Sequence, residues 1–115
     1  MVAHPWQTRA PGLQVWALEP YCGGSHKYFL RGVALSSTHE FRLLTLPGRH
    51  WKWRMHGGAL ALALQAADAL GSRGRPGSGA APQVLFASDM LDLPTFRALA
   101  GPPFDRLPAL LYFHE

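Results

Sequence analysis

The segment best suited to chemistry is a glycine turn between an apolar run and a stretch of helical periodicity. Its residues are Gly23, Gly24, Ser25, His26 and Lys27. Glycine lets the backbone approach a ligand closely, and a helix that begins here would direct free N–H groups at an anion. The spacing is neither the dinucleotide fingerprint nor a phosphate-binding loop with its lysine-serine ending. The residues alone favour a substrate-binding turn and a tight turn capped by Ser25 about equally.

A second segment combines aromatic rings with cations. It consists of Trp51, Lys52, Trp53 and Arg54. Indole faces stack on nucleobases, and lysine and arginine contact phosphates, which makes the segment a candidate RNA-binding surface. The alternative is that one tryptophan packs under the sheet while the cations are solvated, and spacing alone favours that alternative.

Further polar groups follow two other apolar runs. Asp89 comes after Ser88, and His114 and Glu115 end the sequence. A histidine beside a carboxylate can hold a hydroxyl group or move its proton, although an ordinary polar strand end is the simpler explanation of a lone histidine. Cys22 has no activating neighbour beyond a helix N-terminus and is interpreted as structural. We take Asp89 and His114 as the candidate catalytic residues and assign no metal site.

Short apolar runs alternate with helical segments along the chain. The runs cover residues 13–18, 41–46, 84–87 and 109–113, and the helices cover 25–38, 59–70 and 93–100, the last with Asp92 as N-cap. This alternation predicts an α/β fold, a Rossmann-like parallel sheet flanked by helices. Ligands bind such sheets at the carboxyl ends of the strands. All the candidate residues above follow strands, so we expect them on that one edge.

Length and composition indicate how many domains the chain forms, what kind of partner it suits and where it is expected to be located. The 115 residues suffice for one domain, predicted over 13–115 behind a leader of residues 1–12, with a glycine- and arginine-rich loop at 71–82. The net charge of +4 suits a polyanionic partner, although many basic domains bind no nucleic acid. The single cysteine excludes an internal disulfide. With no signal-peptide pattern and no apolar run near the roughly 20 residues of a membrane span, a soluble cytoplasmic protein is expected.

Taken together, several of these segments resemble the N-terminal domain of tRNA-queuosine alpha-mannosyltransferases. The matching motifs, in order, are Glu19–Lys27 (EPYCGGSHK), Leu46-Pro47 before Trp51–Arg54, Leu85–Leu91 (LFASDML) and Leu111–Glu115 (LYFHE). The likeness runs from about Gln14 to Glu115. Three departures stand out: Cys22 lies where the family often has an aromatic residue, the loop at 71–82 is longer, and the family's motif and a second domain continue beyond Glu115.

The resemblance implies a GT-B fold, two facing Rossmann-like domains of which this chain is the N-terminal half. It implies a retaining glycosyltransferase that needs no metal or other cofactor and transfers mannose from GDP-mannose to queuosine in the anticodon of tRNA for aspartate. The C-terminal domain would hold most of the sugar nucleotide, so the isolated chain is expected to be inactive.

The candidate residues take roles within that reaction. Gly23–Lys27 and Glu115 would contact substrate, Trp51–Arg54 would contact tRNA, and Asp89 and His114 would orient hydroxyl groups. Two alternatives stay open: a related enzyme with a lipid or small-molecule acceptor, and a non-catalytic module that binds RNA or a nucleotide.

Overall fold

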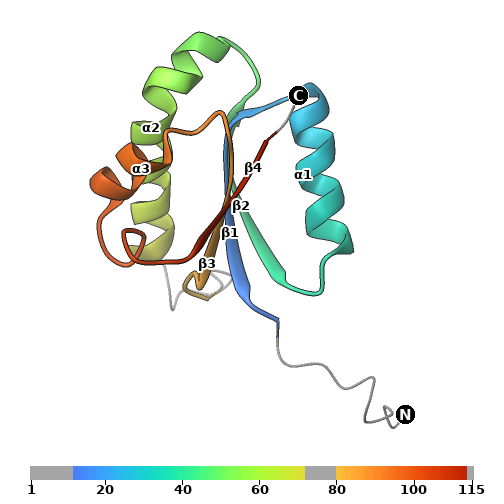
Figure 1. Cartoon of the computed structure of the whole chain (residues 1–115), viewed down its shortest axis with the longest axis vertical. Coiled ribbons are helices and arrows are strands. Elements are labelled where there is room, and N and C mark those ends of the chain that lie inside the picture. Colours follow the sequence, from blue (N-terminus) through green and yellow to red (C-terminus); the bar gives the residue numbers. More distant parts are fainter. Residues whose placement is uncertain (1–11, 72–79, 114–115) are drawn as a thin grey trace, which may run out of the picture.

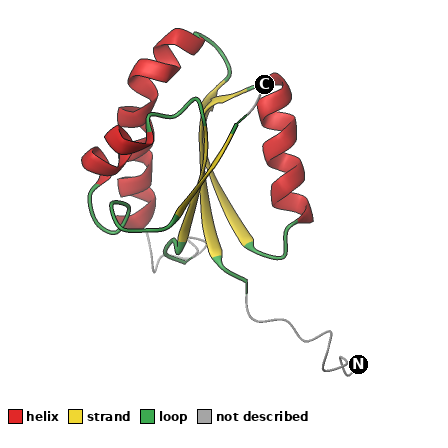
Figure 2. Cartoon of the chain, in the orientation of Figure 1, coloured by secondary structure: helices red, strands yellow, loops and turns green. Residues whose placement is uncertain are grey.

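A computed structural model describes residues 12–71 and 80–113 of the chain. Strands and helices alternate as predicted (Figures 1 and 2). They are β1 (Gln14–Cys22), α1 (Gly24–Ser36), β2 (Glu40–Pro47), α2 (Trp51–Gly71), β3 (Val84–Ser88), α3 (Leu93–Ala100) and β4 (Ala109–Tyr112). Most of the predicted leader, most of the loop at 71–82, and both His114 and Glu115 lie outside the described residues.

The four strands form one parallel sheet in the order β2-β1-β3-β4. α1 covers one face, and α2 and α3 cover the other (Figure 2). This confirms the predicted α/β class, a Rossmann-like parallel sheet flanked by helices. β1 and β3 are neighbours, yet the helices that follow them lie on opposite faces. Open parallel sheets bind their ligands at such a switch point, at the carboxyl ends of the two strands.

The main core lies between the sheet and the layer formed by α2 and α3. Its most buried large side chains are Trp16, Leu18, Leu62, Leu85, Phe96 and Phe104. The other face is more thinly covered, because α1 buries only Leu30 among its residues. On that face Leu43 and Leu110 keep much of their surface exposed. The α1 face is therefore the side on which the sheet has space for further contacts.

β1 is longer than predicted. The prediction ended it before Glu19, but pairing with β2 continues to Cys22, opposite Pro47, after an irregularity in register between Glu19 and Cys22. Pro20 has no N–H to donate, which accounts for the irregular register without ending the strand. The extension places Glu19 inside the buried part of the sheet.

The start of α1 also differs from the prediction. The helix begins at Gly24, with Gly23 as the N-cap and no side-chain cap, so Ser25 lies inside the helix and does not cap it. α3, in contrast, begins as predicted: the Asp92 carboxylate accepts a hydrogen bond from the backbone N–H of Thr95 (3.2 Å).

α2 begins at Trp51, eight residues before the predicted start. The predicted helix began at Ala59, directly after Gly57 and Gly58, which have a low helix propensity. Both glycines instead make room for neighbours: the Trp53 indole lies over Gly57, and Pro20 of β1 lies against Gly58. Tertiary packing thus outweighs the low helix propensity of the glycine pair.

The close contact between α2 and β1 generates a stability prediction. A Cβ atom on Gly58 would lie 2.7 Å from Cβ of Pro20, whereas one on Gly32, within α1, meets nothing within 4 Å. Both changes to alanine gain a similar helix propensity, so we expect Gly58→Ala to be less stable than Gly32→Ala by about 1–3 kcal/mol. Urea unfolding followed by circular dichroism measures the difference. Equal stabilities would contradict the tight packing of α2 on β1.

Candidate functional site at the carboxyl end of the sheet

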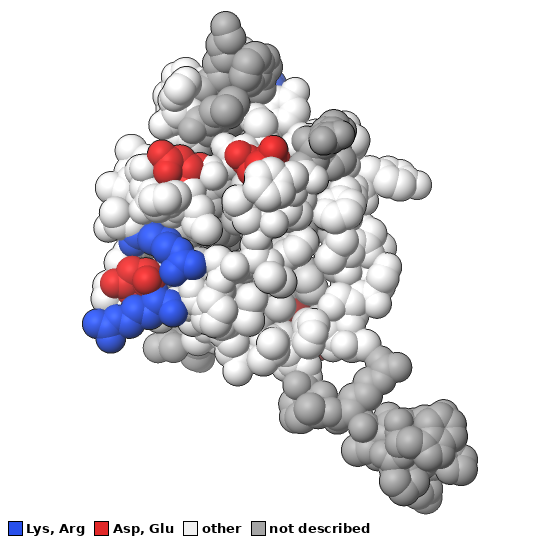
Figure 3. Space-filling view, viewed as in Figure 1, with Lys and Arg blue, Asp and Glu red and all other residues white. Residues whose placement is uncertain are grey.

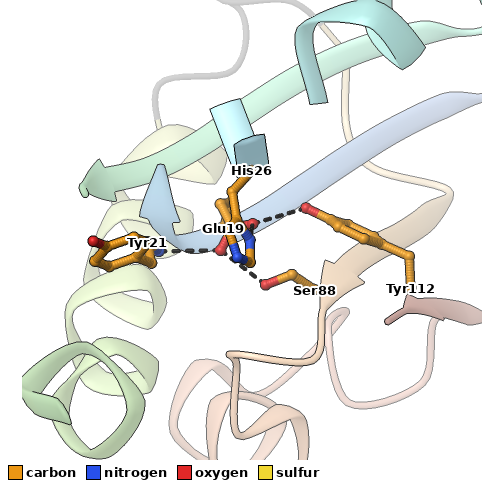
Figure 4. A network of polar contacts seen from close by, with 5 residues as sticks. All are labelled: Glu19, Tyr21, His26, Ser88 and Tyr112. Carbon is orange, nitrogen blue, oxygen red and sulfur yellow. Dashed lines mark hydrogen bonds and ion pairs between the residues drawn. The ribbon is translucent and has the colours of Figure 1, made fainter. Parts of the chain in front are cut away.

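The fully buried carboxyl group of Glu19, near the end of β1, is the centre of four polar contacts (Figure 4). Oε2 accepts from the Ser88 hydroxyl (2.8 Å) and from the backbone N–H of Tyr21 (3.1 Å). Oε1 accepts from the Tyr112 hydroxyl (2.9 Å) and lies 2.9 Å from Nδ1 of His26. We call these five residues the Glu19 cluster. Four hydrogen bonds are about the full number that an ionised carboxylate accepts.

Sheet register brings the cluster together. Ser88 pairs with Tyr112 across β3 and β4, and Leu18 pairs with Ala87 across β1 and β3, which puts Glu19 level with Ser88. Side chains at one level of neighbouring strands point to the same face. Three strands therefore present one polar side chain each, on the α1 face and at the switch point between β1 and β3.

His26 joins the cluster from the first turn of α1. Its side chain is 15% exposed, against 0% for Glu19, and its ring meets the Tyr21 ring edge-on, with centroids 5.9 Å apart. An ionised carboxylate only accepts, so Nδ1 is then the nitrogen that carries the hydrogen in this contact. An imidazole held in this way can orient a hydroxyl group or take its proton.

The cluster also changes the acidity of two neighbouring groups. Burial first, and the Glu19 carboxylate second, raise the pKa of Tyr112 far above its usual range, so its hydroxyl stays a hydrogen-bond donor. Burial, followed again by Glu19, raises the pKa of the Cys22 thiol. A thiol that resists ionisation is a poor nucleophile. This agrees with the structural role that the sequence suggested for Cys22.

Backbone packing shapes the glycine turn beside the cluster. A Cβ atom on Gly23 would lie 2.9 Å from Cα of Gly48, in the turn after β2, and one on Gly48 would lie 2.5 Å from Cα of Gly23. Gly24 has a φ of +53°, in the left-handed region that favours glycine. The first backbone N–H groups of α1 lie at the same edge of the sheet as the Glu19 cluster. At a helix N-terminus, such groups are suited to binding an anion.

The predicted site residues share one edge, but only some of them meet. His26 belongs to the Glu19 cluster, and Ser25 is exposed beside it on α1. Asp89 is exposed after β3, and its backbone N–H hydrogen-bonds to the end of β4 (2.9 Å). His114 and Glu115 lie outside the described residues. The roles assigned to Asp89, His114 and Glu115 stay predictions.

The Trp–Lys–Trp–Arg segment forms the first turn of α2 instead of preceding that helix. Trp53 is 64% exposed although its indole packs over Gly57, so much of its surface is open to a ligand. The side chains of Trp51, Lys52 and Arg54 lie outside the described residues. RNA binding by this segment stays a prediction.

Glu19, Ser88 and Tyr112 were not among the predicted site residues. A glutamate inside an otherwise apolar strand does signal a buried partner, because glutamate is almost never fully buried unless it is paired. The Ser88 and Tyr112 hydroxyls come from 69 and 93 residues further along the chain. Only the register of the sheet shows that they reach Glu19.

Two kinds of feature are absent from the described part of the chain. It contains no group of three or more His, Cys, Asp or Glu side chains placed to hold a metal ion. None of its helices is both long enough and apolar enough to cross a bilayer.

Fold and geometry together define a Rossmann-like domain with a candidate site at the carboxyl ends of β1 and β3, built around a buried carboxylate. Over residues 14–115 the chain matches the family described as "tRNA-queuosine alpha-mannosyltransferase N-terminal", and it belongs to that family. It is 32% identical over 100 residues to a tRNA-queuosine alpha-mannosyltransferase of Drosophila melanogaster. The aligned region covers 85% of the chain but only 23% of that relative. No solved structure matches the chain.

The cluster predicts a specific loss of stability. Tyr112→Phe removes one donor from the buried carboxylate and should lower the free energy of unfolding by about 1–3 kcal/mol, the range for a buried polar group left unsatisfied. Tyr28→Phe removes the same hydroxyl from a side chain that is 86% exposed and should change stability by less than about 0.5 kcal/mol. Urea denaturation of both variants tests this, and equal losses would argue against the Tyr112–Glu19 bond.

The raised pKa of Tyr112 predicts how stability responds to alkali. The folded-state pKa lies above the unfolded-state value of about 10, so the folded chain holds this proton more tightly. That stabilising contribution is complete below about pH 10 and is lost as the pH rises further. The unmodified chain should therefore lose stability above about pH 10 more steeply than Tyr112→Phe. Thermal unfolding across a pH series measures the two slopes, and parallel curves would contradict the shift.

Proposed function

We propose that this chain forms the acceptor side of the active site of a retaining glycosyltransferase, which transfers mannose from GDP-mannose to queuosine in the anticodon of tRNA for aspartate. Family membership supports the reaction class, and the relative from Drosophila melanogaster bears the name of that enzyme. The Glu19 cluster is the observation that extends the proposal to particular residues. It holds an imidazole at the switch point of the sheet, where ligands of such folds bind.

A retaining transfer without a metal or other cofactor has three requirements. The diphosphate must be stabilised as it leaves, the acceptor hydroxyl must be held on the same face of the sugar, and its proton must reach a base. In this proposal the base is the departing phosphate. The N–H groups that follow Gly23 and Gly24 at the start of α1 suit the first requirement, because they are fixed donors at the carboxyl edge of the sheet.

His26 suits the second requirement. Because Glu19 holds Nδ1, the Nε2 atom can accept a hydrogen bond from a hydroxyl of mannose or of the queuosine cyclopentene ring. Asp89 and His114, which follow β3 and β4, are assigned the same kind of positioning role. Trp53 offers an exposed aromatic surface for a nucleobase at the beginning of α2.

The proposal assigns the donor to a second domain. The chain spans 23% of its Drosophila relative, and a GT-B enzyme, the fold that we assign to the whole protein, works in the cleft between two domains. We therefore propose that these 115 residues alone transfer no sugar. We also propose a cytoplasmic location, because the proposed acceptor is a tRNA.

Nucleoside analysis of tRNA tests the reaction. Disrupting the gene that encodes this chain should remove mannosyl-queuosine from tRNA for aspartate and leave queuosine in its place. Complementation with His26→Ala should restore about 10–100-fold less product than the unmodified gene, because the hydroxyl is no longer held. His39→Ala, a histidine at the opposite end of the sheet, should restore it fully. The purified chain, given GDP-mannose and queuosine-containing tRNA, serves as the negative control.

Two outcomes would contradict the proposal. Unchanged mannosyl-queuosine after gene disruption would exclude this donor and acceptor and favour a lipid or small-molecule acceptor. Turnover by the purified chain would show that the second domain is dispensable.

A further inference from the structure

A hollow lies on the α1 face of the sheet, separate from the Glu19 cluster. It is a cavity of about 400 Å³ between the first half of α1 and the end of β2. Lys27 and Arg31 line it from α1, and Cys22 and Thr45 line it from β1 and β2. Its apolar lining includes Leu30 and Leu43. Of the residues that line this cavity, only Lys27 has a role in the proposed transfer reaction, as one of the substrate-contacting residues Gly23–Lys27.

Two cations dominate its polar wall. Lys27 and Arg31 are four residues apart in α1, so they lie on the same face of the helix, one turn from each other. Both are exposed, and neither has an ion-pair partner within the described part of the chain. Positive charges without a carboxylate partner beside a concave surface suit an anionic ligand.

The distribution of charge along the carboxyl edge of the sheet also favours an anionic ligand on the side of α1 and β2. On the face shown in Figure 3, acidic side chains lie near the carboxyl end of the sheet, beside the loop that joins β3 to α3. Asp89 and Asp92 are the acidic residues of that loop, and both are exposed. The turn after β2 instead carries Arg49, two residues beyond Pro47 of the cavity wall. A polyanion is therefore repelled by the loop between β3 and α3 and attracted by the basic residues of α1 and of the turn after β2.

The size and lining of the cavity limit the ligand further. About 400 Å³ falls within the usual range of sites for small organic molecules, and it is far larger than a lone phosphate needs. Leu43, which is 38% exposed, offers apolar contact to a sugar or base, and Thr45 adds a hydroxyl group to the lining. These features match a phosphate attached to an organic group of moderate polarity.

We propose that this cavity binds the phosphate of a ribonucleotide, with Lys27 and Arg31 contacting the phosphate and the exposed part of Leu43 contacting the nucleoside. The choice of a ribonucleotide rests on the proposed function; the anion site itself rests on the geometry. A phosphodiester of bound RNA and the phosphate of a free nucleotide share this chemistry. The site would hold a nucleotide other than the one that receives the sugar.

Titration of the isotope-labelled chain followed by NMR tests the proposal with three probes: adenosine, adenosine 5′-monophosphate (AMP) and the dinucleotide ApA. We expect AMP or ApA to cause saturable shifts of the Cys22, Arg31 and Thr45 amides, with adenosine at least about tenfold weaker because it lacks the phosphate. Tighter binding of ApA assigns the site to RNA, and tighter binding of AMP assigns it to a free nucleotide.

Matched arginine variants provide the control. Arg31→Ala should weaken phosphate-dependent binding about tenfold, whereas Arg106→Ala removes the same charge from the loop before β4, at the opposite end of the sheet, and should change it less than about twofold. Equal effects of the two variants, equal binding of adenosine and AMP, or no saturable shift would overturn the proposal. None of these results depends on mannose transfer, so failure here is separable from failure of the proposed function.

Discussion

Burial of the Glu19 carboxylate is the constraint on which the carboxyl edge of this sheet depends. An unpartnered charge in that position would destabilise the fold by several kcal/mol. The four polar contacts of this carboxylate offset that penalty. The partners come from four places in the chain: the end of β1, the first turn of α1, and the ends of β3 and β4. One side chain thus fixes the relative positions of all the segments that surround the switch point.

The fixed positions of these segments give the side chains of the candidate site a defined orientation. A carboxylate that holds Nδ1 of His26 also determines which ring nitrogen faces a substrate. The close contact of Gly23 with Gly48 holds the two neighbouring turns together, so the start of α1 cannot shift without disturbing the turn after β2. Function in Rossmann-like folds resides in such rim residues and not in the fold itself. The family assignment therefore gains its chemical content from these particular contacts.

Much of the fold was predictable because its strands are short and apolar. Residues 84–87 and 93–100 were placed almost as the structure has them, and the parallel arrangement followed from the alternation of strands and helices. The errors arose where tertiary contacts override local preference. Pro20 continues β1 because its irregular pairing is tolerated, and Gly57 and Gly58 continue α2 because neighbouring side chains fill the space above them.

The candidate site was predicted less completely than the fold. The glycine turn and His26 were found because their residue types stand next to a strand end. Glu19 was overlooked, since its role depends on hydroxyl groups that only the sheet register brings to it. Residue-resolved hydrogen exchange on Glu19→Gln tests this central role most directly. We predict that amide protection falls together at the ends of β1, β3 and β4 and in the first turn of α1, while α2 and α3 keep theirs; a uniform loss across the chain, or no loss at the rim, would contradict it.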